Sequence, residues 1–214
     1  MKITALESMP HKPGMYRVSV DKKPMGYLSS NDVLDLGIVL NQEIDDAVYK
    51  KLLIQVKFST FYSQALNYAD KRLRSKAEVE RYLRLKGCDP LVSQEIVKQL
   101  TSLGVIDEAK LAQAYVHDAV SFRPTSKRGL ELKLKQKKID SSLIDEAIGS
   151  SEFDEGSALD RLIAQKRQLS TYVNNQPRLF RYLMSKGFSY EEIAMRIGKP
   201  KLDRSSRSGN STGF

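Results

Sequence analysis

The sequence has little of what disulfides, metal sites and nucleophilic catalysis require. Its 214 residues include one cysteine, two histidines and no tryptophan. The single Cys88 excludes an intramolecular disulfide, and too few thiol and imidazole groups accompany it for a structural zinc site. Cys88 lies at an apolar position of a repeat, so we interpret it as a core residue rather than a nucleophile. We therefore expect no metal and no cofactor.

Long apolar runs and nucleotide-binding loops are also missing. No stretch approaches the roughly 18 apolar residues of a membrane span, and the first residues lack the apolar region of a signal peptide. The only Gly-Lys pair, Gly198-Lys199, has neither the earlier glycine nor the following hydroxyl residue of a phosphate-binding loop. Acidic doublets fall near expected helix starts, where they complement the helix dipole. We expect a cytoplasmic protein that is not an enzyme and does not bind a membrane.

Positive charge is what the sequence has in excess. Lysine and arginine number 35 against 26 acidic residues, which gives a net charge of +9 and a pI near 9.5. Two stretches are denser: residues 71–86 carry seven basic and two acidic side chains, and residues 127–138 carry six and one. Fields of this sign attract polyanions such as nucleic acid. The alternative interpretation is a solvated helix face on which lysines only maintain solubility.

The first 58 residues predict a small β-sheet followed by a helix. Three short runs rich in β-branched and aromatic residues are separated by proline and glycine, as in hairpins. From about residue 44 onward, apolar residues recur at helical spacing. Asn41 precedes this pattern and is placed to cap the helix.

The remaining chain contains a repeat. Leu83, Leu134 and Leu183 coincide when three stretches are superposed, at spacings of 51 and 49 residues. An apolar residue precedes each leucine by four positions, so each stretch predicts a helix with one buried face. We expect a mainly α fold with tandem three-helix repeats in an elongated curved array. Its expected parts are an N-terminal β-hairpin or short sheet plus helix (1–58), the three repeats (59–106, 107–150 and 151–198) and a disordered basic tail (199–214).

Each repeated helix ends on a lysine followed closely by an apolar residue. Gly87 and Gly187 stand at this exit in the first and third copies, where glycine readily adopts the positive φ of a helix C-cap. Lys138 stands there in the second copy.

Three groups of residues, in this order along the chain, carry a family likeness. They are Arg74-Ser75-x-x-Glu78 with Leu83-x-x-Lys86-Gly87, then Leu103-Gly-Val-Ile-Asp107, and then Lys186-Gly187-Phe188-Ser189. Over residues 60–198 the chain thereby resembles the RecX family of bacterial recombination regulators. It departs from that family at Glu108, Leu111 and Lys138, where the family usually has aspartate, an aromatic residue and glycine.

The resemblance implies a non-enzymatic protein that binds the RecA recombinase filament on single-stranded DNA. It further implies inhibition of strand exchange, ATP hydrolysis and SOS co-protease function, and so a role in DNA repair and recombination. We expect a monomer that also binds duplex DNA weakly. The expected filament and DNA contacts lie on the middle helix of each repeat, at Arg81, Arg84, Arg128, Lys133, Lys135, Lys137, Lys138, Arg178, Arg181 and Lys186.

Two other functions are compatible with these patterns. A helix-turn-helix-like transcription regulator would read duplex DNA, but base reading favours arginine, asparagine or glutamine at a helix start, whereas the dense basic stretch is mostly lysine. A helical solenoid that binds only protein would use its charge for solubility alone. Dependence of binding on salt, measured with and without DNA, distinguishes these functions.

Overall fold

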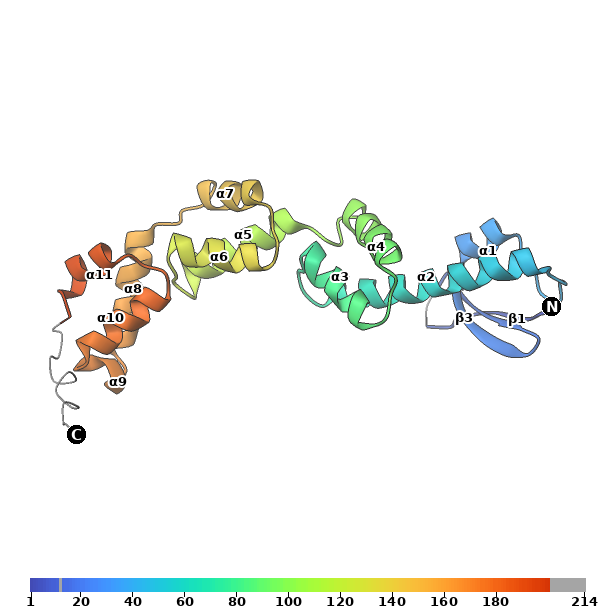
Figure 1. Ribbon diagram of the computed structural model, residues 1–214, viewed down its shortest axis with the longest axis horizontal. Coiled ribbons are helices and arrows are strands. Elements are labelled where there is room, and N and C mark those ends of the chain that lie inside the picture. The colour runs from blue at the N-terminus through green and yellow to red at the C-terminus, as the bar shows by residue number, and fades with distance from the viewer. Residues whose placement is uncertain (12, 201–214) are drawn as a thin grey trace, which may run out of the picture. The chain divides into compact units, whose positions relative to one another are not determined.

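The computed structural model describes residues 1–11 and 13–200 and divides into two compact units, Met1–Asp107 and Glu108–Phe214 (Figure 1). Helices dominate it, with one small three-stranded sheet at the N-terminus. The mainly α fold with a small N-terminal β segment is thus confirmed. The predicted tail lies outside the described residues from position 201 onward. No helix in the described ranges is long and apolar enough to cross a membrane.

The N-terminal sheet is an antiparallel meander that packs against two helices. Its strands follow each other in the order β1-β2-β3. Buried residues from all three strands, including Ile3, Val18 and Leu28, share one core with Leu52 and Val56 of the long helix that follows. The elements are β1 (Ile3–Ser8), β2 (Met15–Val20), β3 (Lys23–Ser29), α1 (Ser30–Leu36) and α2 (Asp46–Asp70).

The start of α2 differs from the sequence prediction. Asp45 is the N-cap, with its Oδ1 accepting the Val48 N–H at 2.8 Å. Asn41, the predicted cap, instead has a φ of 66° and donates its N–H to the carbonyl oxygen of Ile3. Pairing of this segment with the first strand delays the helix by one turn, so tertiary contacts override the local capping signal.

The long helix α2 runs without interruption through residues 58 and 59, the expected boundary between the N-terminal segment and the first repeat. Its first half contributes Leu52 and Val56 to the core under the sheet, and its second half contributes Ala65 and Ala69 to the core of the first repeat. The two parts of this unit therefore share one helix.

Three groups of helices follow the sheet, each with its own apolar core. Their middle helices, α3, α6 and α10, begin at side-chain caps provided by Ser75, Ser126 and Asn175. The first repeat adds α3 (Lys76–Leu85) and α4 (Pro90–Ser102) to the end of α2. The second contains α5 (Glu108–Ser121), α6 (Lys127–Gln136) and α7 (Ser141–Gly149), and the third contains α8 (Glu155–Arg167), α9 (Ser170–Val173), α10 (Gln176–Ser185) and α11 (Tyr190–Ile197).

The repeat alignment predicts the cores correctly. Leu83, Leu134 and Leu183 are fully buried, each in a different core. The exits are equivalent too, since Gly87 and Gly187 have φ values of 80° and 91° and Lys138 has 58°. Lysine in the left-handed region costs backbone energy that glycine would not.

Replacing Leu83, Leu134 or Leu183 by alanine is expected to lower the free energy of unfolding by about 2–5 kcal/mol, because each change leaves a cavity in a closed core. Chemical denaturation followed by circular dichroism measures the effect. Leu132, which is 57% exposed on the same helix as Leu134, provides the matched control. Losses below about 0.5 kcal/mol at two of the three buried sites contradict the alignment.

Candidate nucleic-acid interface

The ten predicted contact residues are accessible but do not form one cluster. Eight side chains are exposed, and those of Lys137 and Lys186 are half-buried. Arg81 and Arg84 lie on α3 of the first unit, whereas the other eight residues belong to the second unit. Each unit is therefore considered separately.

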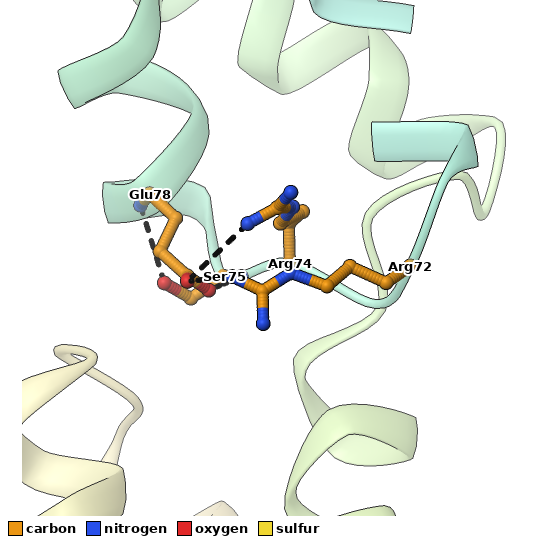
Figure 2. Close-up of polar contacts among 4 residues, drawn as sticks. All are labelled: Arg72, Arg74, Ser75 and Glu78. Carbon is orange, nitrogen blue, oxygen red and sulfur yellow. Dashed lines mark hydrogen bonds and ion pairs between the residues drawn. The ribbon is translucent and has the colours of Figure 1, made fainter. Parts of the chain in front are cut away.

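In the first repeat, some of the basic residues are used within the fold (Figure 2). Arg72 and Arg74 both approach Glu78, with Nη2 and Nη1 respectively 3.6 and 3.9 Å from its Oε1. The guanidinium of Arg74 also lies 3.9 Å from the ring centroid of Tyr68. Glu78 closes a capping box with Ser75 at the start of α3. Much of the positive charge before α3 thus stabilises a helix start. Arg81 and Arg84 are exposed on α3, as is Lys76 at its first position.

The second and third repeats meet at a tight contact between the start of α6 and the end of α10. Ser126 Oγ donates to the Lys186 carbonyl oxygen at 2.8 Å and accepts the Gly129 N–H at 2.9 Å. A Cβ on Gly129 would lie 2.5 Å from the same carbonyl oxygen, and one on Gly187 would collide with Ser126 Oγ. This glycine contact fixes Lys186 of the third repeat beside the second repeat.

A basic cleft of about 410 Å³ opens beside this junction, between α5 and α6. Its lining includes Arg123 in the turn before α6, Lys133 on α6 and Lys137 at the C-cap of α6, together with Tyr115 and Asp118 of α5. Both lysines are predicted contact residues, whereas Arg123 was not predicted because it lies outside the repeated helix. Three basic side chains thus share the cleft with a single carboxylate. The remaining lining residues are Ala119, Thr125, Leu130 and Gln136.

The surroundings of the cleft change the pKa of Lys133. Partial burial lowers the pKa of Lys133, and the Lys186 ammonium lowers it further; Asp118 opposes the shift and Arg123 adds to it. The charged form of Lys133 is therefore less favourable here than in water. A bound anion would relieve this cost, because it favours the protonated amine.

Cations and tyrosine rings alternate in the third repeat. The Lys166 Nζ lies 4.8 Å from the ring centroid of Tyr182 and 5.9 Å from that of Tyr172. Lys186 Nζ lies 5.3 Å from the Tyr182 centroid, and the Arg178 guanidinium lies 5.7 Å from that of Tyr172. We call these five residues the basic-tyrosine track. Lys166 and Tyr172 were not predicted, because they lie on α8 and α9 rather than on the repeated helix.

Lys186 of the basic-tyrosine track does not line the cleft, but its charge lowers the pKa of Lys133, which does. Lys137 adds one further pair, with its Nζ 5.5 Å from the Tyr115 centroid. The other predicted residues of the second unit lie outside the cleft lining. Lys135 pairs with Glu131 at 3.9 Å, and Lys138 forms the helix exit. Arg128 is exposed on α6, and Arg178 and Arg181 are exposed on α10. Among the described residues, no group of three histidine, cysteine or carboxylate side chains is placed to hold a metal ion.

Family models match both of the first two repeats. The model for the first three-helix domain of RecX matches residues 62–100, and that for its second three-helix domain matches residues 107–148. Among curated relatives, the regulatory protein RecX of Leuconostoc citreum is 24% identical over 212 residues, covering 95% of this chain and 78% of its own length. That of Bacillus subtilis is 24% identical over 200 residues, covering 90% and 74%.

Solved structures show the same fold. A crystal structure of regulatory protein RecX superposes with a TM-score of 0.71 at 20% identity, over 92% of this chain and 98% of that one. The crystal structure of RecX from Lactobacillus salivarius gives a TM-score of 0.50 at 28% identity, over 64% and 92%. Fold and relatives define a regulatory protein built from three-helix repeats. The chain belongs to the RecX family.

Proposed function

We propose that this protein binds the RecA recombinase filament on single-stranded DNA and inhibits strand exchange, ATP hydrolysis and SOS co-protease function. The observation that carries the proposal is the alternation of cations and tyrosine rings from Arg178 to Lys186, whose charge acts on Lys133 in the basic cleft. Single-stranded nucleic acid is bound by basic residues that follow its phosphates and by aromatic rings that contact its bases. Membership of the RecX family supports RecA as the partner.

Repetition supports a filament as the target. A recombinase filament presents the same protein surface at regular intervals along a phosphate backbone, and this chain presents three similar helical repeats. Each contact raises the effective concentration of the next, so individually weak contacts add up to firm binding. In this proposal the protein acts by binding and not by catalysis. It works in the cytoplasm as a monomer, and it also binds duplex DNA weakly.

The helix-turn-helix alternative is less well supported by the start of α6. Such a reader places the first residues of its recognition helix against base edges in the major groove. Here Thr125 and Ser126 are buried, and the backbone of Gly129 approaches the carbonyl of Lys186. The third repeat therefore covers part of the helix end that would have to enter the groove.

A titration of this protein into RecA filaments tests the proposal directly. We expect ATP turnover on single-stranded DNA to slow at substoichiometric to equimolar ratios, while the protein alone hydrolyses no ATP. Bovine serum albumin at the same concentration controls for nonspecific effects. Filaments whose ATP turnover is unchanged by a large excess of the protein, or intrinsic ATPase activity that survives rigorous purification, contradict the proposal.

A further inference from the structure

We propose that the cleft lined by Arg123, Lys133 and Lys137 is a binding site for one backbone phosphate of single-stranded nucleic acid. The inference deepens the proposed function and rests on it only for the identity of the nucleic acid that is bound. Its basis is the convergence of basic side chains from three places in the second repeat: Arg123 in the turn before α6, Lys133 on the face of α6 and Lys137 at its C-cap.

The cleft is suited to a small anion in both size and charge. Its volume of about 410 Å³ lies at the lower end of typical ligand sites. Arg123 offers a planar fork of N–H donors that matches two phosphate oxygens, and Lys133 and Lys137 offer compact ammonium groups. Asp118 is the only carboxylate in the lining, so the side chains leave a net positive charge that an anion would neutralise.

Comparison of the repeats shows that the fold does not require a lysine at position 133. The residue before the buried leucine is Tyr82 in the first repeat and Tyr182 in the third, and both rings are half-buried against their cores. Tyr82 stacks on Tyr68 with ring centroids 4.1 Å apart. The second repeat has an exposed lysine in place of this packing, and desolvation and the neighbouring Lys186 lower the pKa of that lysine. A cation at a position that otherwise carries a tyrosine indicates a role in binding.

The glycine junction adds a further cation. Because Ser126 and Gly129 hold the Lys186 carbonyl, the third repeat places its lysine close enough to lower the pKa of Lys133. A phosphate beside Lys133 therefore also lies in the field of Lys186, although Lys186 itself does not line the cleft. An acidic protein segment would also be attracted, but the tyrosine rings at Tyr115 and Tyr182 favour nucleic acid, which can stack its bases.

Fluorescence anisotropy with a labelled single-stranded oligothymidine tests the site. The double variant Arg123→Gln, Lys133→Gln is expected to bind about tenfold or more weakly, because it loses charge-assisted contacts. The slope of log K against log salt should fall by about 0.7, which corresponds to the loss of one phosphate contact on a single strand. The control Arg17→Gln, Lys98→Gln removes the same two residue types at exposed positions of the first unit. Equal affinities and slopes for the two double variants overturn the proposal.

A second variant separates binding from folding. Lys133→Tyr introduces the residue of the other repeats, and we expect a melting temperature at least equal to that of the natural chain together with the same tenfold loss of oligothymidine affinity. Nuclear magnetic resonance of the lysine side chains adds a direct readout, because a bound phosphate favours the charged amine and raises the pKa of Lys133. The charged groups that face this amine are Lys186, Asp118 and Arg123. A pKa of Lys133 that stays unchanged at saturating oligothymidine contradicts the site.

The two proposals fail in different ways. If oligothymidine binds through the cleft but RecA filaments are indifferent to the protein, the phosphate site stands and the proposed function is wrong. If filaments are inhibited equally by the natural chain and by the Arg123→Gln, Lys133→Gln variant, and oligothymidine binding does not depend on these residues, the phosphate site is wrong and the proposed function stands.

Discussion

Simultaneous replacement of Lys133, Lys137 and Lys138 by glutamate is expected to weaken binding to single-stranded DNA and to RecA filaments by at least about a hundredfold. Two of the three residues line the basic cleft, and the third extends the same helix end. The slope of log K against log salt should fall by about 1.4, because the phosphate contact in the cleft and a second contact at Lys138 are lost on a single strand. In addition, each new carboxylate repels the phosphates of the DNA backbone.

Circular dichroism and a matched variant show whether this loss reflects the interface or the overall charge. Helical content should stay unchanged, because none of the three side chains is part of a buried core. Replacing Lys50, Lys51 and Lys57 of α2 by glutamate changes the net charge by the same amount at exposed positions of the first unit. If both triple variants inhibit the recombinase with natural salt dependence, the basic helix is merely a solvated face.

Gly129→Ala is expected to lower the free energy of unfolding by about 1–3 kcal/mol. Helix propensity alone predicts the opposite sign, because alanine is favoured over glycine inside a helix by about 1 kcal/mol. The added Cβ would lie 2.5 Å from the Lys186 carbonyl oxygen and 2.7 Å from Thr125 Oγ1, so the third repeat must shift. Oligothymidine affinity should fall as well, because Lys186 moves away from the cleft.

Gly149 offers a control for this effect. It is the last residue of α7, in the same unit, and a Cβ there meets nothing within 4 Å. Gly149→Ala should therefore leave stability unchanged or raise it, and DNA binding should be unaffected. Denaturant titrations of both variants provide the comparison, and similar stabilities for the two alanine variants would falsify the junction as a close contact.

Features set by local periodicity could be predicted from the sequence. The i, i+4 apolar pattern that ends at Leu83, Leu134 and Leu183 requires only neighbouring residues, and all three positions are buried as expected. The three equivalent exits could be aligned for the same reason, although the positive φ of Lys138 was not predicted. Side-chain caps at Ser75 and the other helix starts also act over only three residues.

Contacts between distant residues could not be predicted in this way. Gly129 and Lys186 are 57 positions apart, and nothing in the sequence near either residue indicates that their backbones meet. Arg123 lies in a turn outside the repeated helix, so the alignment did not draw attention to it. The predicted cap at Asn41 is wrong, because the backbone N–H of Asn41 donates a hydrogen bond to the carbonyl oxygen of Ile3 in β1. Each case depends on tertiary pairing rather than on local preference.

Because α2 is continuous, the number of residues between its two apolar faces sets both the distance between the two cores and the angle between these faces around the helix axis. Leu52 and Val56 point into the core under the sheet, and Ala65 and Ala69 point into that of the first repeat. Each residue turns an α-helix by about 100°, so one residue inserted between these pairs would rotate one apolar face away from its core. Loops between the other repeats can change length without this penalty. The segment from Val56 to Ala65 therefore tolerates substitution on its exposed side far better than any change in length.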